Sequence, residues 1–332
     1  VVIDAECGLA AVADKADETF VTGAGQLWNR IKSGGTLTAI EATTVPKLYG
    51  SKARLTDFIW AAASAILPDG AALLDAMAGT GAVTRVLSRR FDVSANDANR
   101  YAAILTRAQT LSFEDEGRAL RTRLRAAADE NADRLRDLTQ DAVLEEEGFL
   151  NDEFNEENRV RYVEFCAKPV LFPQDYRPRR GEPYQLCLRG YANIYLGVTQ
   201  CIDADSIRKA IDAETIKGSD VWTLCIAALL AAVNVCNSGP HFAQPRNLKS
   251  VVAFKHVAER RARSVRFEFE RMLDHFAQRP SSRHVVATSS DNWALALQTF
   301  AKNTASSPER AIYIDPPYSK LQYSRYYHVL NT

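Results

Sequence analysis

AALLDAMAGTGAV, residues 71–83, joins a short apolar run to a turn that contains two glycines. Ala71–Asp75 is typical of a buried strand, and a helix is expected from about Val83 to Arg90. The following residues predict a second strand at Phe91–Asn96 and a second helix at Arg100–Leu111. Strand, glycine turn, helix and strand form a βαβ unit, which predicts a parallel sheet covered by helices.

The two glycines lie where the first strand turns into its helix. Glycine lets the backbone approach a ligand closely, and a helix start favours negative groups such as a carboxylate or phosphate. Gly79 and Gly81 therefore indicate either a ligand-binding loop or a tight structural turn. Asp97 follows Gly81 by 16 residues and ends the second strand. It is expected either to accept hydrogen bonds from ribose hydroxyls or to cap the next helix.

A further chemical pattern, Asp-Pro-Pro-Tyr, occupies residues 315–318 and follows the hydrophobic run Ala311–Ile314. Such a run is typical of a strand, and open α/β sheets bind ligands at the carboxyl ends of their strands. Two prolines restrict the backbone and remove two donors. A carboxylate and a carbonyl that both accept from an exocyclic amine would direct its lone pair toward an incoming methyl group. The alternative is a Pro-Pro turn without a chemical role.

Together these segments resemble the Dam-like family of DNA adenine-N6 methyltransferases. In that family a lysine-containing segment precedes the glycine loop, as KLYGSK does here at residues 47–52. NDAN at residues 96–99 matches the family's acidic second-strand motif, and residues 315–318 match its catalytic motif. SDNW at residues 290–293 lies where the family has an acidic residue near the cofactor's adenine. The family usually has an aromatic residue at Met77, but methionine can also pack against an adenine ring.

The resemblance implies S-adenosylmethionine (SAM) as the cofactor and a flipped adenine of double-stranded DNA as the substrate. The implied catalytic residues are Asp315, Pro316, Pro317 and Tyr318. The residues implied to bind SAM are Lys47, Tyr49, Gly50, Lys52, Asp75, Met77, Ala78, Gly79, Gly81, Asp97, Ala98, Asp291 and Asn292. Two alternatives stay open, an RNA adenine-N6 methyltransferase and a non-catalytic SAM-fold subunit of a larger complex.

The order of the motifs, cofactor loop first and catalytic loop last, marks the class of this family with a target-recognition domain inserted between them. We expect a Rossmann-like α/β methyltransferase core at residues 47–112 and 284–332. A large, mainly helical insertion, the expected target-recognition domain, occupies 113–283, and residues 1–46 form a segment of unknown role. The family's sheet has further strands after the catalytic motif. We therefore expect that a C-terminal portion beyond Thr332, or a partner subunit, completes the sheet.

Charge is uneven along the insertion, although the net charge of the chain is zero. Residues 114–157 have 15 acidic and six basic side chains, and their apolar residues follow helical spacing. This pattern predicts a long amphipathic helix, either an arm or a coiled-coil contact with a partner. Residues 241–283 have ten Lys or Arg against four Asp or Glu. Arginines here are expected either to contact DNA or to form a solvated basic face.

The DNA-contact candidates are Arg246, Arg260, Arg261, Arg263 and Arg266, with Tyr323 and Arg325 after the catalytic motif. Residues 148–185 are expected to be loop-like because they are rich in proline and arginine. Further helices are expected at Asp205–Ala213, Val221–Val235, Phe254–Phe276 and Asn292–Lys302, and further strands at 283–291 and 311–315.

Composition narrows the classes of protein to consider. The six cysteines form no CxxC pair, which argues against a zinc site and for the reduced thiols of a cytoplasmic protein. No apolar run approaches the roughly 20 residues that a membrane span needs. We therefore expect a protein without a metal and without a membrane anchor.

Overall fold

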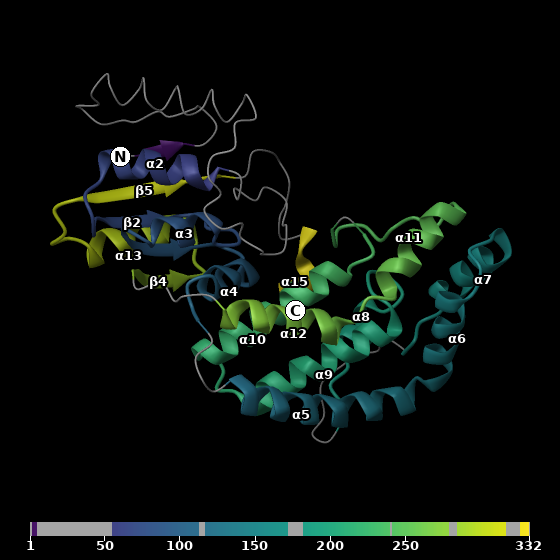
Figure 1. Cartoon of the computed structure of the whole chain (residues 1–332). Coiled ribbons are helices and arrows are strands. Elements are labelled where there is room, and N and C mark those ends of the chain that lie inside the picture. Colours follow the sequence, from purple (N-terminus) through teal and green to yellow (C-terminus); the bar gives the residue numbers. More distant parts are fainter. Residues whose placement is uncertain are drawn as a thin grey trace. The chain divides into compact units, whose positions relative to one another are not determined.

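A unit with a β-sheet and a unit made of helices form the chain in the computed structural model (Figure 1). The first consists of residues 1–112 and 280–321, and the second of residues 113–279 and 322–332. The structure describes residues 2–4, 55–112, 117–171, 182–239, 241–278, 284–316 and 326–331. The helical unit thus contains nearly all of the segment that the sequence marks as an insertion.

Among the described residues, five parallel strands form the sheet, in the order β1-β5-β2-β3-β4. They are β1 (Val2–Asp4), β2 (Ala72–Asp75), β3 (Asp92–Asn96), β4 (Val285–Ser289) and β5 (Arg310–Ile314). The prediction of a parallel α/β sheet is confirmed. Strand β1 is an addition that the sequence pattern did not indicate, and it pairs with β5 at the edge of the sheet.

Helices cover both faces of this sheet. Successive strand residues point to opposite sides, so each face has apolar side chains that helices can bury. The helices are α2 (Thr56–Ile66), α3 (Ala82–Leu87), α4 (Arg100–Ala108) and α13 (Trp293–Asn303). Leu73 of β2 packs in one cluster with Phe58 of α2 and Leu87 of α3. Its neighbour Leu74 packs in a second cluster with Phe300 of α13. The central strand is therefore buried on both sides, as is usual in parallel sheets.

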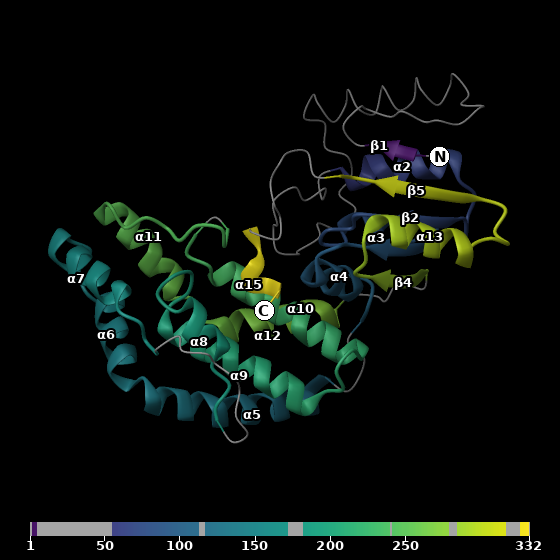
Figure 2. The same cartoon turned by 180° about the vertical axis from the view of Figure 1, so that it is seen from behind.

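Nine helices of the described residues form the second unit (Figure 2). They are α5 (Gly117–Leu138), α6 (Gln140–Asn151), α7 (Glu156–Ala167), α8 (Leu186–Tyr191), α9 (Val198–Glu214), α10 (Asp220–Cys236), α11 (Val251–Arg261), α12 (Val265–Ala277) and α15 (His328–Asn331). Helix α5 lies along α9 and buries the narrow stripe Leu120, Leu124, Ala128 and Leu135. The predicted amphipathic segment is therefore helical, but it divides into α5 and α6 at Thr139.

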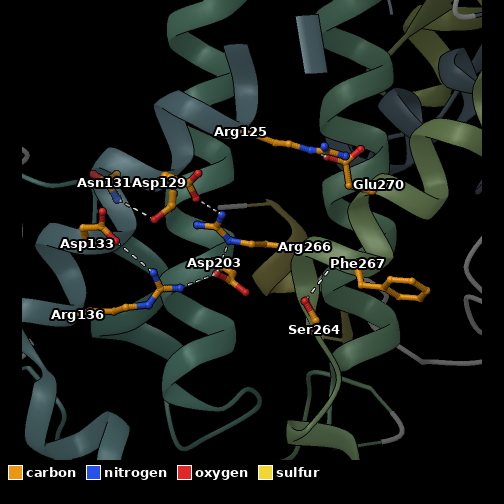
Figure 3. A network of polar contacts seen from close by, with 11 residues as sticks. Arg125, Asp129, Asn131, Asp133, Arg136, Asp203, Ser264, Arg266, Phe267 and Glu270 are labelled. Carbon is orange, nitrogen blue, oxygen red and sulfur yellow. Dashed lines mark hydrogen bonds and ion pairs between the residues drawn. The ribbon is translucent and has the colours of Figure 1, made fainter. Parts of the chain in front are cut away.

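Three segments differ from the sequence-based expectations. Helix α7 lies inside the expected loop 148–185, where Tyr162 and Phe165 are buried. The helix expected at Phe254–Phe276 is two helices, because the Ser264 hydroxyl accepts a hydrogen bond from the Phe267 amide and starts α12 (Figure 3). Helix α15 belongs to the helical unit and not to the sheet core.

The contacts of the chain's last described residues explain that third difference. Tyr327 and Leu330 are buried, and the carbonyl of Tyr326 accepts a hydrogen bond from the Phe242 amide at 2.9 Å. The ring of His328 lies 6.0 Å from that of Tyr191. Apolar burial and ring contacts therefore hold this segment to the helices.

Candidate functional site

The carboxyl ends of the parallel strands meet at one edge of the sheet. The residues that follow β2 are tied to both neighbouring strands there. The amide of Ala76 donates to the carbonyl of Tyr313 in β5 at 3.0 Å, and the amide of Ala78 donates to the carbonyl of Asn96 in β3 at 2.8 Å. The glycine loop and the Asp315 end of β5 are therefore neighbours, although about 240 residues separate them in the sequence.

The two glycines of this loop have different roles. Both have a positive φ angle, 57° at Gly79 and 81° at Gly81. A Cβ on Gly81 would lie only 2.6 Å from the Cα of Thr106, whereas a Cβ on Gly79 would meet no atom within 4 Å. Gly81 thus allows α3 and α4 to pack closely, as expected for the alternative of a tight structural turn. Gly79 leaves open space beside the backbone, as a ligand-binding loop requires.

Asp97 holds the glycine loop from the end of β3. Its Oδ2 accepts a hydrogen bond from the Gly79 amide at 3.0 Å, and its Oδ1 accepts from the Asn99 amide at 2.8 Å. The N-cap of α4 is Asn99, so the alternative that Asp97 caps this helix is wrong. A carboxylate offers about four acceptor positions, so Asp97 can accept further bonds from a ligand.

Asn96 is a positioning residue that the sequence pattern did not single out. Its side chain is buried, and its Nδ2 donates to the carbonyls of Ala76 at 3.2 Å and Asp291 at 3.1 Å. Its Oδ1 accepts from the Asp291 amide at 2.9 Å and the Ser289 hydroxyl at 2.8 Å. One amide side chain thus connects the segments that follow β2 and β4. A buried polar side chain that satisfies several loops was the available signal, but it needs the fold to be visible.

Asp97 and Asp315 lie near enough to the carboxylate of Asp75 for their charges to act on it. Asp75 is fully buried and accepts a hydrogen bond from the Thr84 hydroxyl at 2.6 Å. Burial, and then the negative charges of Asp315 and Asp97, raise the pKa of Asp75 to about 7. Burial also raises the pKa of Asp97, against the hydrogen bonds from Asn99 and Gly79. Such an arrangement favours a positively charged ligand, because a nearby cation would stabilise the ionised carboxylates.

The remaining described candidates lie at or beside the same edge. Met77 is half-buried against the cluster that contains Leu74, and Ala98 is exposed after β3. Asn292 caps α13 by accepting a hydrogen bond from the Ala294 amide at 2.8 Å, so its side-chain oxygen has a structural role. The half-buried residues Ala78, Asp291, Asp315 and Pro316 complete the set that the fold brings together. The candidates Lys47, Tyr49, Gly50, Lys52, Pro317, Tyr318, Tyr323 and Arg325 lie outside the described residues.

The expected DNA contact of Arg261 is wrong in this structure. The side chain is buried, and its Nη1 donates to the Tyr162 hydroxyl at 2.7 Å and the Cys166 Sγ at 3.3 Å. Its charge also acts on the buried carboxylate of Glu146. Arg261 therefore belongs to the core of the helical unit. A buried cation is stable only with hydrogen-bond partners or an opposite charge, and Arg261 has both.

Arg266 also has partners inside the protein (Figure 3). Its Nε donates to Asp203 at 2.8 Å, and its guanidinium forms an ion pair with Asp129. Asp203 is nearly buried, so this pair ties α12 to α9 in the interior of the unit. The expectation that Arg266 binds DNA is not supported, because its charge is already balanced by two carboxylates.

Arg246, Arg260 and Arg263 have different surroundings. Arg246 and Arg263 are exposed and Arg260 is partly buried. Within the described ranges, none of these three side chains forms an ion pair with a carboxylate. They are the described arginines of the expected DNA contact that stay available to a partner.

No family model, no curated protein and no solved structure matches the chain, so comparisons do not identify a ligand for the sheet edge. Among the residues that the structure describes, no three His, Cys, Asp or Glu side chains gather in a way that could hold a metal ion. In the same ranges, no helix has the length and apolar character that crossing a bilayer would require. The five described cysteines are free thiols, and Cys187 and Cys201 have their sulfur atoms 3.3 Å apart.

Proposed function

We propose that this chain is the cofactor-binding and catalytic part of a SAM-dependent methyltransferase that modifies N6 of a flipped adenine in duplex DNA. The observation that carries the proposal is the meeting of Asp315 and Pro316 with Gly79 and Asp97 at one edge of the sheet. The Asp-Pro-Pro-Tyr sequence supplies the acceptors that an amine needs, and the glycine loop supplies space beside it.

The strand order supports a Rossmann-like sheet. Taken in chain order from β2, the four main strands lie as β4-β3-β2-β5, which corresponds to the order 3-2-1-4 of doubly wound sheets. In such sheets the order reverses between the first and fourth strands, and ligands bind outside the carboxyl ends at that point. Here the reversal lies between β2 and β5, whose following residues include Gly79 and Asp315.

The charges at this edge and the open space at Gly79 support SAM as the ligand. Gly79 leaves open space, and Asp97 has acceptor capacity for ribose hydroxyls. The carboxylates of Asp75, Asp97 and Asp315 complement a cation, and SAM supplies a methyl group on a positively charged sulfur. Met77 is half-buried beside them and offers an apolar surface to a purine.

The chain's own residues would act on the amine. Asp315 accepts one N–H of the adenine amine and the Pro316 carbonyl accepts the other, so that the nitrogen lone pair points toward the methyl group. The carboxylate of Asp315 can also take the proton that the amine loses on methylation. Tyr318 stacks on the base and keeps it out of the duplex. Rate enhancement then comes from positioning and electrostatic stabilisation, without a covalent intermediate on the protein.

The test is methyl transfer from radiolabelled SAM to unmethylated duplex DNA by the full-length protein, with matched RNA beside it. Asp315→Ala is expected to lower the rate at least about 100-fold, because it removes a group that acts on the reacting amine. SAM binding by Asp315→Ala, measured by calorimetry, should stay within a few-fold of wild type.

Label in DNA adenine that disappears in the variant would support the proposal. Label in RNA alone would favour the RNA methyltransferase. SAM binding without transfer to either nucleic acid would favour the non-catalytic subunit. A wild-type protein that does not bind SAM would contradict the proposal from its first step.

A further inference from the structure

The surface arginines of the helical unit are of two kinds. Arg123, Arg125 and Arg271 have side chains that are 55%, 64% and 49% exposed, yet each pairs with a glutamate at 2.7–2.9 Å. Arg260 and Arg263 have no such partner among the described residues, nor does Arg246. An unbalanced positive charge is therefore not a general property of this surface. Arg246, Arg260 and Arg263, which have no carboxylate partner in the described part of the chain, gather in one place.

That place is the end of α11 and the segments beside it. His256 and Arg260 are four residues apart on α11 and so share a face, Arg263 lies in the turn to α12, and Arg246 precedes α11. The pKa of Arg260 is lowered by desolvation and then by the charges of Arg263 and Arg246. The pKa of His256 is lowered by desolvation and then by Arg246 and Arg260. Helix α11 and the turn after it hold His256, Arg260 and Arg263 near one another, and the charge of Arg246 acts on His256 and Arg260; we call these four side chains the basic cluster.

The carboxylate of Glu259 is near enough to His256 for its charge to raise the pKa of that side chain. No ion pair of Glu259 with the basic cluster is present among the described residues. Exposed Lys249 and Lys255 add positive charge around α11. Like charges that repel one another on a folded surface carry a free-energy cost, which an anion from outside would reverse.

The backbone beneath the basic cluster is held firmly. Gln200 is buried, and its Nε2 donates to the carbonyls of Arg260 at 2.9 Å and Arg263 at 2.8 Å. Its Oε1 accepts from the Gly197 amide at 3.0 Å at the start of α9. The Arg260 guanidinium donates to the Val235 carbonyl at 3.1 Å. The turn that presents Arg260 and Arg263 is thus fixed to two buried helices.

We propose that the basic cluster binds the phosphate backbone of a DNA duplex. Guanidinium groups match phosphate in shape and charge, and several of them on a rigid turn suit a regular row of phosphates better than a single small anion. The inference rests on the proposed function, which requires a duplex, but it assigns the contact to residues that the catalytic chemistry does not use. Arg261 and Arg266 are excluded from this contact by their internal partners.

The experiment is fluorescence anisotropy with a labelled DNA duplex of about 20 base pairs at several salt concentrations. The full-length protein is compared with R246Q/R260Q/R263Q and with the control R123Q/R125Q/R271Q, which removes the same charge from arginines that are paired. The slope of log affinity against log salt changes by about 0.9 for each phosphate that the protein no longer neutralises. The cluster variant should therefore have a slope that is shallower by about two to three units, and the slope of the control variant should change by less than one.

A double variant, R246Q/R263Q, leaves the Arg260 bond to Val235 in place and guards against a loss of folding, which circular dichroism would reveal. Its slope should be shallower by about two units. Equal slopes for the cluster variant and wild type, or equal changes in cluster and control variants, would overturn the proposal. So would a wild-type protein that binds single-stranded RNA or anionic lipid vesicles but no DNA duplex. SAM binding and methyl transfer are measured separately, so a duplex-binding protein without transferase activity would contradict the proposed function alone.

Discussion

Buried carboxylates in the two units have different neighbours, although burial raises the pKa of both Glu146 and Asp75. In the helical unit, Glu146 accepts from the amides of Val198 and Thr199 at the start of α9, with Arg261 as a nearby opposite charge. In the sheet unit, Asp75 is buried near two other carboxylates, and its pKa rises to about 7.

Asp205 strengthens this contrast. It lies in the helical unit and accepts from the amides of Cys187 and Leu188 at 2.7 Å and 2.8 Å, although burial raises its pKa to about 8. These two amides have no partner within α8, and their hydrogen bonds offset the free-energy cost of burying the Asp205 carboxylate. At the sheet edge, the like charges of Asp315 and Asp97 add to the effect of burial on the pKa of Asp75, and a buried group beside like charges is typical of a functional site. The difference teaches that burial alone does not mark the site, whereas burial beside like charges does.

The largest expected effect tests the structural role of the helical unit's buried charges. Arg261→Met should lower the free energy of unfolding by about 3–5 kcal/mol, because it leaves Glu146 buried without its opposite charge. Chemical denaturation at pH 7 measures this change. Arg263→Met is the matched control on the surface and should change stability by less than about 0.5 kcal/mol. Equal effects of the two substitutions would show that Arg261 is not part of a buried network.

A smaller effect is expected from the glycines of the sheet unit. Gly81→Ala should cost about 2 kcal/mol or more, since left-handed strain is joined by a clash with the Thr106 backbone. Gly79→Ala should cost about 1 kcal/mol of strain alone, because its Cβ enters open space. Thermal denaturation compares their stabilities, and calorimetry with SAM compares their binding. Gly79→Ala should weaken SAM binding more than stability, and unchanged affinity would argue against a ligand in that space.

A third effect, comparable in size to that of Gly81→Ala, is the pH dependence that Asp75 contributes. Its pKa is near 3.8 when unfolded and about 7 when folded, so the folded state holds the extra proton between these values. Stability from this group is complete below about pH 4 and is lost as the pH rises through 7. Asp75→Asn removes the titration, so from pH 5 to pH 8 it should gain about 2–3 kcal/mol of stability relative to wild type.

Urea denaturation of both proteins at pH 5 and pH 8 measures that difference. Asp205 titrates in the same range in wild type and variant and therefore cancels. Parallel stability curves for the two proteins would mean that Asp75 is not the group whose pKa is raised. A SAM-bound wild type should show less of the pH dependence, because a cation near Asp75 favours its ionised form.

The sheet-edge residues were predictable because they follow strands with a local signature. Asp315 and Asp97 directly follow predicted strands, Gly79 lies in the turn after another, and parallel strands bring their carboxyl ends to one edge. Asn96 was not chosen, since an asparagine at a strand end has many ordinary roles until its four hydrogen bonds to distant segments are visible.

The arginines show where local information ends. The sequence by itself determined the alternation of strands and helices, the glycine turn and the grouping of basic residues at 241–283, because each depends on residues close together in the chain. Only the tertiary structure decided which arginines are available. Arg266 pairs with Asp129, which is 137 positions away in the sequence, and Arg261 donates to Tyr162, which is 99 positions away. Arg263 is only two residues from Arg261 but is exposed. Whether a charge is balanced depends on which distant side chains the fold brings within hydrogen-bonding distance, and spacing along the chain does not determine that.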